Sequence, residues 1–312
     1  MKNIAIVMGG NSKEKDISIK SANTIYKHID RSKYHPYKVL CVNENKFIVT
    51  IHNLTIEINN EDFSFFLNNK KIRFDKIFMI IHGDPGENGK LCTYFEARKI
   101  PYTSCNESVS ALTFNKFKCN QHLRSIGYQV PYSQIYTKDY KTKFPCIIKP
   151  SCSGSSFGIS KVYNDVELTI AICKAKQYGQ EIIIEEFIDG RELTCAVYNL
   201  YNKIETLPIT EIISQNDIFD YDAKYNGKSI EETPASIEKN IKIQIENIAK
   251  KTYKDLNLSG LIRIDFIMDS TQPYIIEINT IPGFSEESIV PKMLKSAEIK
   301  IGDFITAQIQ NA

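Results

Sequence analysis

Residues 260–288 read GLIRIDFIMDSTQPYIIEINTIPGFSEES and contain two runs rich in isoleucine, 261–269 and 274–280. A polar Ser-Thr-Gln-Pro segment between the runs is typical of a turn. Apolar, β-branched runs on either side of such a turn predict a β-hairpin. Successive side chains of a strand point to opposite faces, so Arg263 and Asp265 lie on one face of the first strand and its isoleucines on the other.

Four polar side chains gather on one face of this predicted hairpin. Glu277 and Asn279 share a face of the second strand. A three-residue turn sets Asp265 opposite Glu277 and Arg263 opposite Asn279. Facing carboxylates repel each other, and a divalent cation would remove the conflict. Ligands that are all oxygen favour Mg²⁺ or Mn²⁺, which accompany nucleotide phosphates. In the alternative interpretation, the face is exposed and Arg263 neutralises the acids.

The composition limits the classes of protein to consider. At 312 residues the chain suits two or three subdomains better than one core. The 39 basic residues nearly balance the 37 acidic ones, so no net charge favours nucleic acid or a membrane surface. Eight cysteines without a CxxC pair are typical of reduced thiols in a cytosol. The first apolar run is too brief for a signal peptide, and no run reaches membrane-spanning length, so we expect a cytoplasmic protein.

Two segments in the first third of the chain predict a parallel α/β unit. An apolar run over residues 4–8 ends in Gly9-Gly10, and apolar residues at helical spacing follow. A second apolar run, 76–81, ends in the loop His82-Gly-Asp-Pro-Gly-Glu-Asn-Gly. Ligands of parallel α/β units lie at the C-terminal ends of strands, so these loops are candidate site loops. His82 by itself decides nothing, since a lone histidine is more often structural.

Residues 144–158, FPCIIKPSCSGSSFG, predict a strand that delivers Lys149 to a loop of serines and glycines. Backbone N–H groups and hydroxyls of such a loop can wrap a polyphosphate, while the lysine supplies a point charge. The lysine precedes the glycines, so the segment is not a P-loop. Alone it could equally be a flexible linker, but together with the hairpin it favours phosphate binding. Two further stretches, 237–256 and 289–309, show the apolar spacing of packing helices.

Together these segments resemble the D-alanine–D-alanine ligases of the ATP-grasp family. Arg263-Ile-Asp265, followed by Glu277-Ile-Asn279-Thr-Ile-Pro-Gly283, is similar to the metal-binding end of an ATP-grasp enzyme. The extension to Ser-Ile-Val-Pro is similar to the ligases in particular. The resemblance covers nearly the whole chain, in the right order.

The resemblance implies an α/β and α+β architecture, the three-subdomain ATP-grasp fold. A parallel α/β domain would span residues 1–110, a central lid 111–190 and a catalytic subdomain 191–312, with the nucleotide between the last two. It implies that ATP phosphorylates one D-alanine and that the amine of a second D-alanine attacks the acyl phosphate. Both substrates would be D-alanine, two Mg²⁺ or Mn²⁺ ions would assist, and the product would serve peptidoglycan synthesis. The family also suggests a homodimer, with neither nucleic acid nor membrane as a partner.

The resemblance also implies roles for individual residues. The catalytic and substrate-binding positions are Glu14, His82, Ser155, Tyr225, Arg263, Gly283, Ser288 and Ile289. The ATP-binding positions are Lys149, Ser156, Glu185, Glu186, Ile188, Glu192 and Lys224, and the metal ligands are Asp265, Glu277 and Asn279.

Within this set, Glu14 would hold the first ammonium and Ser288 the second carboxylate. The Arg263 side chain and the Gly283 N–H would stabilise the oxyanion, while Tyr225 would bridge a mobile loop to Glu14. Without the resemblance, Glu14 reads as a solvated acid in the first turn of a helix.

Three positions depart from the family pattern: Asn88 replaces a common Asp, Cys92 a Gln, and Asn120 a phosphate-contacting Lys. Two alternatives stay open. A D-alanine–D-lactate or D-alanine–D-serine ligase would share every metal and ATP residue. A regulatory ATP-binding module without turnover is disfavoured by the intact hairpin residues. Tyr225 is typical of ligases that make D-alanyl-D-alanine, so we expect D-alanine to be preferred over D-lactate.

Overall fold

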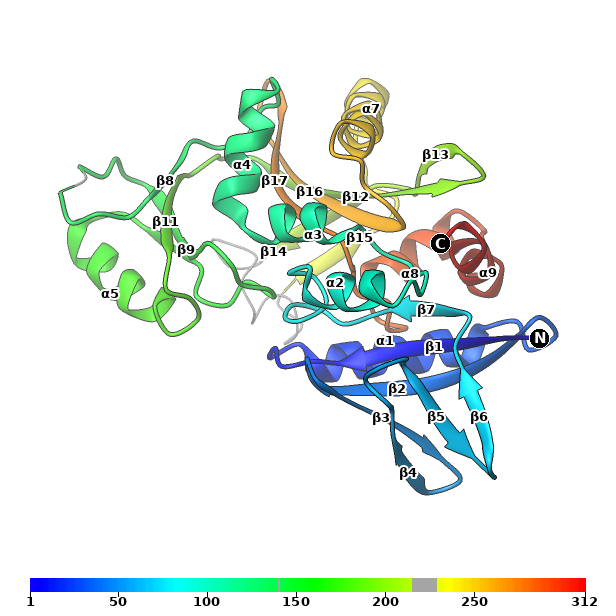
Figure 1. Ribbon diagram of the computed structural model, residues 1–312. Coiled ribbons are helices and arrows are strands. Elements are labelled where there is room, and N and C mark those ends of the chain that lie inside the picture. The colour runs from blue at the N-terminus through cyan, green and yellow to red at the C-terminus, as the bar shows by residue number, and fades with distance from the viewer. Residues whose placement is uncertain (140, 215–228) are drawn as a thin grey trace.

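The computed structural model describes residues 1–139, 141–214 and 229–312, and these form three main sheets with helices on their faces (Figure 1). The N-terminal sheet, the central sheet and the C-terminal sheet lie in different parts of the molecule, and the central unit projects to one side. None of the helices in these ranges is both long and apolar enough to cross a membrane.

The N-terminal sheet has the strand order β4-β3-β2-β1-β7. Its strands are β1 (Lys2–Gly9), β2 (Tyr34–Asn43), β3 (Lys46–Ile51), β4 (Leu54–Glu57) and β7 (Lys76–Met79). β1 pairs in parallel with β2 and β7, and α1 (Lys15–His28) follows it, which confirms the expected parallel α/β unit. The turn between them requires glycine, because Gly10 has φ of +93° and a Cβ there would lie 2.7 Å from Cγ2 of Ile81.

Smaller elements complete this part of the chain. A two-stranded ribbon consists of β5 (Ser64–Leu67) and β6 (Lys70–Arg73). The helices that follow β7 are α2 (Lys90–Ala97), α3 (Glu107–Phe114) and α4 (Lys116–Ser125). Asn106 and Asn115 cap the last two by accepting backbone N–H groups of the first turn, so the chain can start a new helix immediately after α3.

The central sheet is antiparallel, with the order β10-β9-β11-β8. Its strands are β8 (Ser133–Ile135), β9 (Cys146–Pro150), β10 (Ser160–Val162) and β11 (Ile182–Glu186). Helix α5 (Asp165–Ala175) packs on β9 and β10, and their apolar side chains form a small core separate from the other two core clusters. The central unit therefore holds itself together without burying side chains of the N-terminal sheet.

The C-terminal sheet has the order β15-β14-β12-β16-β17, with β13 beside β12. Its strands are β12 (Arg191–Leu200), β13 (Lys203–Thr206), β14 (Thr210–Ser214), β15 (Ser229–Glu232), β16 (Leu261–Met268) and β17 (Pro273–Asn279). Helix α7 (Lys239–Asp255) covers one face, where Ile245 and Ala249 are fully buried.

Strands β16 and β17 are the predicted hairpin, and its register is confirmed. Asp265 pairs with Glu277 and Arg263 with Asn279. The register shifts between Asp265 and Phe266, so a bulge separates the polar end of the hairpin from its turn. The four polar side chains consequently lie at the end of the hairpin that is remote from the turn.

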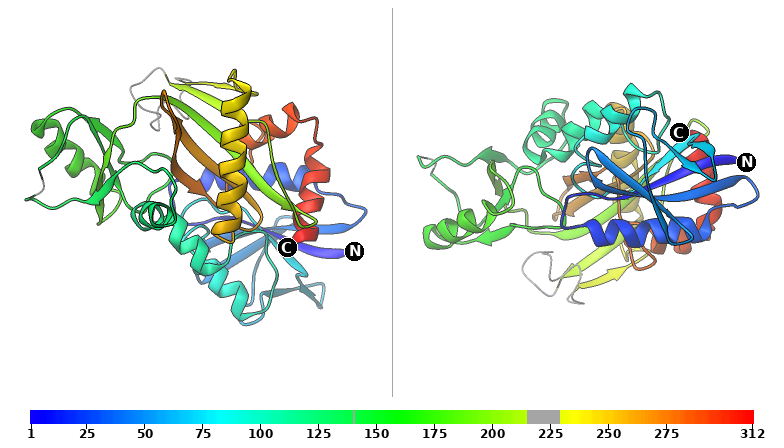
Figure 2. Two further views of the ribbon diagram at one scale, coloured as in Figure 1. Left: turned by 90° about the horizontal axis from the view of Figure 1, so that it is seen from above. Right: turned by 60° about the horizontal axis from the view of Figure 1, so that its bottom comes forward.

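The last stretch of the chain forms two helices, α8 (Ile289–Ser296) and α9 (Ile301–Asn311), and not one. Glu298 has φ of +57°, and the Ile299 N–H returns to the Leu294 carbonyl, which closes α8. Helix α9 contacts both α1 and β12, so it lies between the N-terminal and C-terminal sheets (Figures 1 and 2). Phe304 of α9 stacks on Phe284, and both belong to the same core cluster as β1 and β2.

The three-part division at residues 110 and 190 stays a prediction. The first boundary falls within α3, and the second falls between β11 and β12. The C-terminal helices share a core with the N-terminal sheet, so these two parts are packed more intimately than three separate units would be.

Removing a side chain from this shared core should destabilise the protein. Ile305 in α9 is fully buried, and we expect Ile305→Ala to lower the free energy of unfolding by about 2–5 kcal/mol because it leaves a cavity. Ile170 on α5 is 65% exposed, so Ile170→Ala is the matched control and should shift the urea midpoint little. Equal midpoint shifts in the two variants would contradict the shared core.

Candidate active site

Asp265 is the centre of the polar cluster on the hairpin. The Arg263 guanidinium donates to both of its carboxylate oxygens, with Nε at 2.9 Å and Nη2 at 2.8 Å. Thr194 Oγ1 donates to Oδ1 at 2.6 Å, and Asn279 Nδ2 donates to Oδ2 at 3.0 Å. The carboxylate is buried, and these donors stabilise its negative charge.

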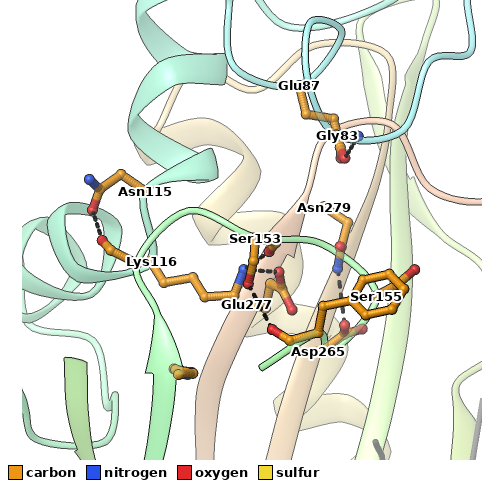
Figure 3. Close-up of polar contacts among 12 residues, drawn as sticks. Gly83, Glu87, Asn115, Lys116, Ser153, Ser155, Asp265, Glu277 and Asn279 are labelled. Atoms are coloured by element: carbon orange, nitrogen blue, oxygen red, sulfur yellow. Dashed lines mark hydrogen bonds and ion pairs between the residues drawn. The ribbon is translucent and has the colours of Figure 1, made fainter. Parts of the chain in front are cut away.

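Glu277, on the neighbouring strand, forms an ion pair with Lys116 at the start of α4 (Figure 3). The Lys116 Nζ lies 2.8 Å from Oε1 of Glu277 and also donates to the Ser153 carbonyl of the loop after β9. Burial acts to lower the pKa of Lys116, but the charge and hydrogen bond of Glu277, together with the charge of Glu87, outweigh it and the pKa is raised. Lys116 therefore stays charged and links the hairpin to the serine-rich loop.

The first cavity at this cluster has the residues predicted to bind ATP along its walls. It has a volume of about 540 Å³ and lies between the central and C-terminal sheets. Its lining includes Lys149, Ser156, Glu185, Glu186, Ile188, Glu192, Asp265 and Glu277. Strands β9 and β11 pair directly, which brings Lys149 Nζ to 2.6 Å from Glu185 Oε1 in a buried ion pair.

A second cavity, of about 510 Å³, lies between the N-terminal and C-terminal parts of the chain. Its lining includes Glu14, His82, Glu87, Ser155, Arg263, Glu277, Asn279, Gly283, Ser288 and Ile289. All the predicted catalytic and substrate positions that the structure describes thus face one space. Glu277 lines both cavities, so they meet at the hairpin.

The serine-rich loop after β9 reaches across to the N-terminal unit. Ser155 Oγ donates to Glu14 Oε1, and Ser155 itself has a left-handed backbone with φ of +46°. A Cβ at Gly154 would overlap Oε2 of Glu14, so a larger residue there would displace the Glu14 carboxylate. The predicted partners Lys224 and Tyr225 lie outside the described residues.

The three departures from the family pattern have structural contacts. Asn120 Nδ2 donates to the Pro131 carbonyl at 2.8 Å, and Cys92 Sγ donates to the Cys105 carbonyl at 3.3 Å. Asn88 donates to Asp84 within its own loop. Each replacement thus makes a local polar contact within the fold.

Glu87 is a site residue that the sequence argument missed. Its carboxylate accepts the Gly83 N–H at 2.7 Å and the Ile281 N–H at 3.2 Å. Burial raises the pKa of Glu87 to about 7, and the negative charge of Glu14 adds to the rise. The position of Glu87 in a glycine-rich loop at the end of a strand was the signal that could have identified it. Lys116 was missed as well, because its ion-pair partner, Glu277, lies far away in sequence.

The hairpin residues fit a divalent cation that is shared with a polyphosphate. Mg²⁺ is usually bound by one or two carboxylates plus phosphate oxygens, and Asp265 and Glu277 supply two carboxylates. Among the described residues, none donates to Oδ1 of Asn279, which leaves an oxygen available. The described chain holds no cluster of three or more His, Cys, Asp or Glu side chains that could bind a metal by itself.

Family models match almost the whole chain. The model described as D-ala D-ala ligase N-terminus matches residues 3–105, and the model described as D-ala D-ala ligase C-terminus matches residues 128–310. The chain is 42% identical to a D-alanine–D-alanine ligase of Flavobacterium johnsoniae, covering 99% of both chains. It is 42% identical to the ligase of the same name from Azobacteroides pseudotrichonymphae, covering 100% of both.

Solved structures agree with these matches. A D-Ala:D-Ser ligase from Enterococcus faecalis has a TM-score of 0.87 at 28% identity, with 99% of this chain and 98% of that one covered. A D-alanine–D-alanine ligase from Coxiella burnetii has a TM-score of 0.86 at 24% identity, covering 99% and 93%, and shares the fold. These likenesses confirm the expected ATP-grasp fold, and the chain belongs to the D-alanine–D-alanine ligase family.

Proposed function

We propose that this protein is an ATP-dependent ligase that joins two D-alanines into D-alanyl-D-alanine through D-alanyl phosphate, for peptidoglycan precursor synthesis. The observation that carries the proposal is the meeting of two cavities at Glu277, one lined by the predicted nucleotide residues and one by the predicted substrate residues. The proposal includes a cytoplasmic location, two Mg²⁺ or Mn²⁺ ions and a homodimer, as the family resemblance suggests.

The nucleotide cavity supplies charge and position for phosphoryl transfer. In this proposal Lys149 contacts the phosphates, and Glu185, Glu186 and Ile188 line the adenine slot, while Glu192 accepts the ribose hydroxyls. Bound Mg²⁺ or Mn²⁺, held by Asp265, Glu277 and Asn279, would neutralise phosphate charge. Phosphoryl transfer depends mainly on such positioning and electrostatic stabilisation.

The second cavity positions the two amino acids. Glu14 holds the ammonium of the first D-alanine, whose carboxylate attacks the γ-phosphorus and displaces ADP. Ser288, at the start of α8, holds the carboxylate of the second D-alanine, next to Ile289. The amine of this second molecule attacks the acyl phosphate carbon, and phosphate leaves from the tetrahedral intermediate.

Charge on the tetrahedral oxygen needs donors that are already in place. Arg263 and the Gly283 N–H both belong to the lining of the second cavity and are the proposed donors. Removing one such donor typically lowers kcat by about 10²–10³. Ser155 and Tyr225 would complete the site by linking the loops around Glu14.

The first test is the product of the unmodified protein. With ATP and Mg²⁺, D-alanine should stimulate ADP release and give D-alanyl-D-alanine by mass spectrometry. In equimolar mixtures with D-lactate or D-serine at neutral pH, we expect D-alanyl-D-alanine to predominate. Tyr225→Phe should relax this preference by up to about tenfold, since it removes a single neutral hydrogen bond.

Other products of the same assay would contradict specific parts of the proposal. Mainly depsipeptide, or mainly D-alanyl-D-serine, would contradict the acceptor specificity while leaving the ligase reaction in place. Absence of D-alanine-dependent ADP release would contradict turnover and favour an ATP-binding module.

Glu277→Gln should abolish turnover because it removes a negative charge from the proposed metal site. We expect at least about a 100-fold loss of kcat and weaker Mg²⁺-dependent ATP binding by calorimetry. Glu205→Gln is the control: Glu205 also pairs with lysine, at Lys250, but lines neither cavity. Because Glu277→Gln leaves the buried Lys116 without its ion-pair partner, thermal denaturation must show that the variant is folded. Near-normal turnover in a folded variant would contradict the metal assignment.

The serine-rich loop, residues 151–158, should become better protected when nucleotide binds. We expect its amides to exchange hydrogen more slowly with ATP and Mg²⁺ than without, because backbone N–H groups of the loop would then contact phosphate. Helix α7 lies away from both cavities and should not respond. Unchanged exchange over residues 151–158 would show that this loop does not cover the phosphates.

A further inference from the structure

The backbone loop 281–285, between β17 and α8, has two of its amide groups bonded to side chains of the N-terminal unit. The Ile281 N–H donates to Glu87 Oε1 at 3.2 Å. The Phe284 N–H donates to Ser21 Oγ at 3.0 Å. Both acceptors are about 200 residues or more away in sequence, so these bonds are tertiary contacts that join two parts of the fold.

One amide N–H of this loop has no acceptor among the described residues. Pro282 has no N–H, and the Ser285 N–H donates to Ser288 Oγ at 3.1 Å. Within the described ranges, no acceptor takes the N–H of Gly283, which lines the substrate cavity. Since its neighbours are already bonded within the protein, Gly283 is the amide of this loop that remains for a ligand.

The carbonyl side of the loop is fixed by His82. Its Nδ1 lies 2.7 Å from the Ile281 carbonyl oxygen, which can only accept, so Nδ1 carries the proton. Nε2 is then the acceptor for the Ser21 hydroxyl at 3.2 Å, and Ser21 Oγ in turn accepts the Phe284 N–H. These hydrogen bonds run in one direction, from the Phe284 N–H through Ser21 and His82 to the Ile281 carbonyl. Burial lowers the pKa of His82, which keeps the imidazole neutral, as this series of hydrogen bonds requires.

The three side chains that form hydrogen bonds to loop 281–285 belong to the N-terminal unit. Ser21 lies on α1, while His82 and Glu87 lie in the loop after β7. The second oxygen of Glu87 accepts the Gly83 N–H at 2.7 Å, so the carboxylate is itself held in place. We call Ser21, His82 and Glu87 the clamp.

We propose that the clamp residues are positioning residues of the ligase reaction, which fix loop 281–285 so that the Gly283 N–H stabilises the oxyanion of the tetrahedral intermediate. The inference rests on the proposed function and deepens it. It assigns His82 to the Ile281 carbonyl and not to a substrate. Oxyanion donors act only when held at hydrogen-bonding distance, and a misplacement of about 1 Å can cost roughly 100-fold in rate.

A clamp predicts a particular kinetic pattern. Loss of a positioned transition-state donor lowers kcat and leaves KM nearly unchanged, whereas loss of a substrate contact raises KM. A purely structural contact changes stability and neither constant. Separate measurement of kcat and of KM for each D-alanine therefore distinguishes the three roles.

The chain offers a matched control for Ser21. Ser18 lies one turn earlier on the same helix, is equally buried, and also bridges two backbone groups: it accepts from Gly9 N at 2.8 Å and donates to the Ile80 carbonyl at 2.6 Å. Its bridge stays within the N-terminal sheet. We expect Ser21→Ala to lower kcat by about tenfold or more with KM within about twofold, and Ser18→Ala to leave both within about twofold.

His82 provides a second, independent pair of variants. The amide nitrogen of asparagine can occupy the place of Nδ1, so His82→Asn keeps the bond to the Ile281 carbonyl, whereas His82→Ala loses it. We expect His82→Asn to retain about tenfold more kcat than His82→Ala. Hydrogen exchange at amides 281 and 284 should accelerate in Ser21→Ala and His82→Ala and stay unchanged in Ser18→Ala.

Several outcomes would overturn the clamp. Equal losses of kcat in Ser21→Ala and Ser18→Ala would do so, as would a raised KM for D-alanine with unchanged kcat in His82→Ala. Unchanged hydrogen exchange at amides 281 and 284 in Ser21→Ala and His82→Ala would also contradict the clamp, and this measurement does not depend on turnover. If unmodified protein forms no dipeptide, the proposed function fails instead, and the exchange data still report on the clamp.

Discussion

Two carboxylates, the buried Asp265 and the partly buried Glu277, pair across neighbouring strands. Their repulsion requires positive charge nearby, and the fold supplies it from two directions. Arg263 comes from the same strand, two residues away, and neutralises Asp265 through two hydrogen bonds. Lys116 comes from the start of α4 and pairs with Glu277. The Lys116–Glu277 pair links α4 and the serine-rich loop to the hairpin, beside the apolar contacts that α4 makes with β17.

The same charge balance explains why the cavities meet where they do. Lys116 also bonds the Ser153 carbonyl, so the loop after β9 is drawn towards the hairpin and not left in solvent. A polyphosphate and its cations would enter a site that already contains both signs of charge. Glu277 lines both cavities, so the proposed nucleotide and amino-acid sites adjoin at this residue.

The features that follow from local pattern could be predicted from the sequence, and those that follow from long-range packing could not. Alternation of residue type and a short turn suffice to pair Asp265 with Glu277. An apolar run that ends in glycines and is followed by apolar residues at helical spacing suffices for the parallel unit. The bulge, where Ile276 of β17 has no partner on β16, has no signal in the alternation of residue types. The Glu87–Ile281 bond joins residues 194 positions apart, and the two residues carry no shared signal. The break after α8 was missed because Glu298, in a left-handed conformation, is not the glycine that usually marks a helix end.

The units of the protein are joined by contacts of unequal strength. The N-terminal and C-terminal sheets share one apolar core, which includes α9, so separating them would expose fully buried side chains. The central unit has its own core and meets the N-terminal loop through Glu14 and Lys13. Lys13 Nζ lies 4.4 Å from the ring centre of Tyr178, a contact of a kind worth about 0.5–1 kcal/mol when exposed. A hydrogen bond to a charged group, such as that from Ser155 to the Glu14 carboxylate, contributes about 1.5–3 kcal/mol. The central unit therefore meets the N-terminal loop through polar contacts, whereas the loop that carries Gly283 is held against the N-terminal unit by hydrogen bonds beside a shared apolar core.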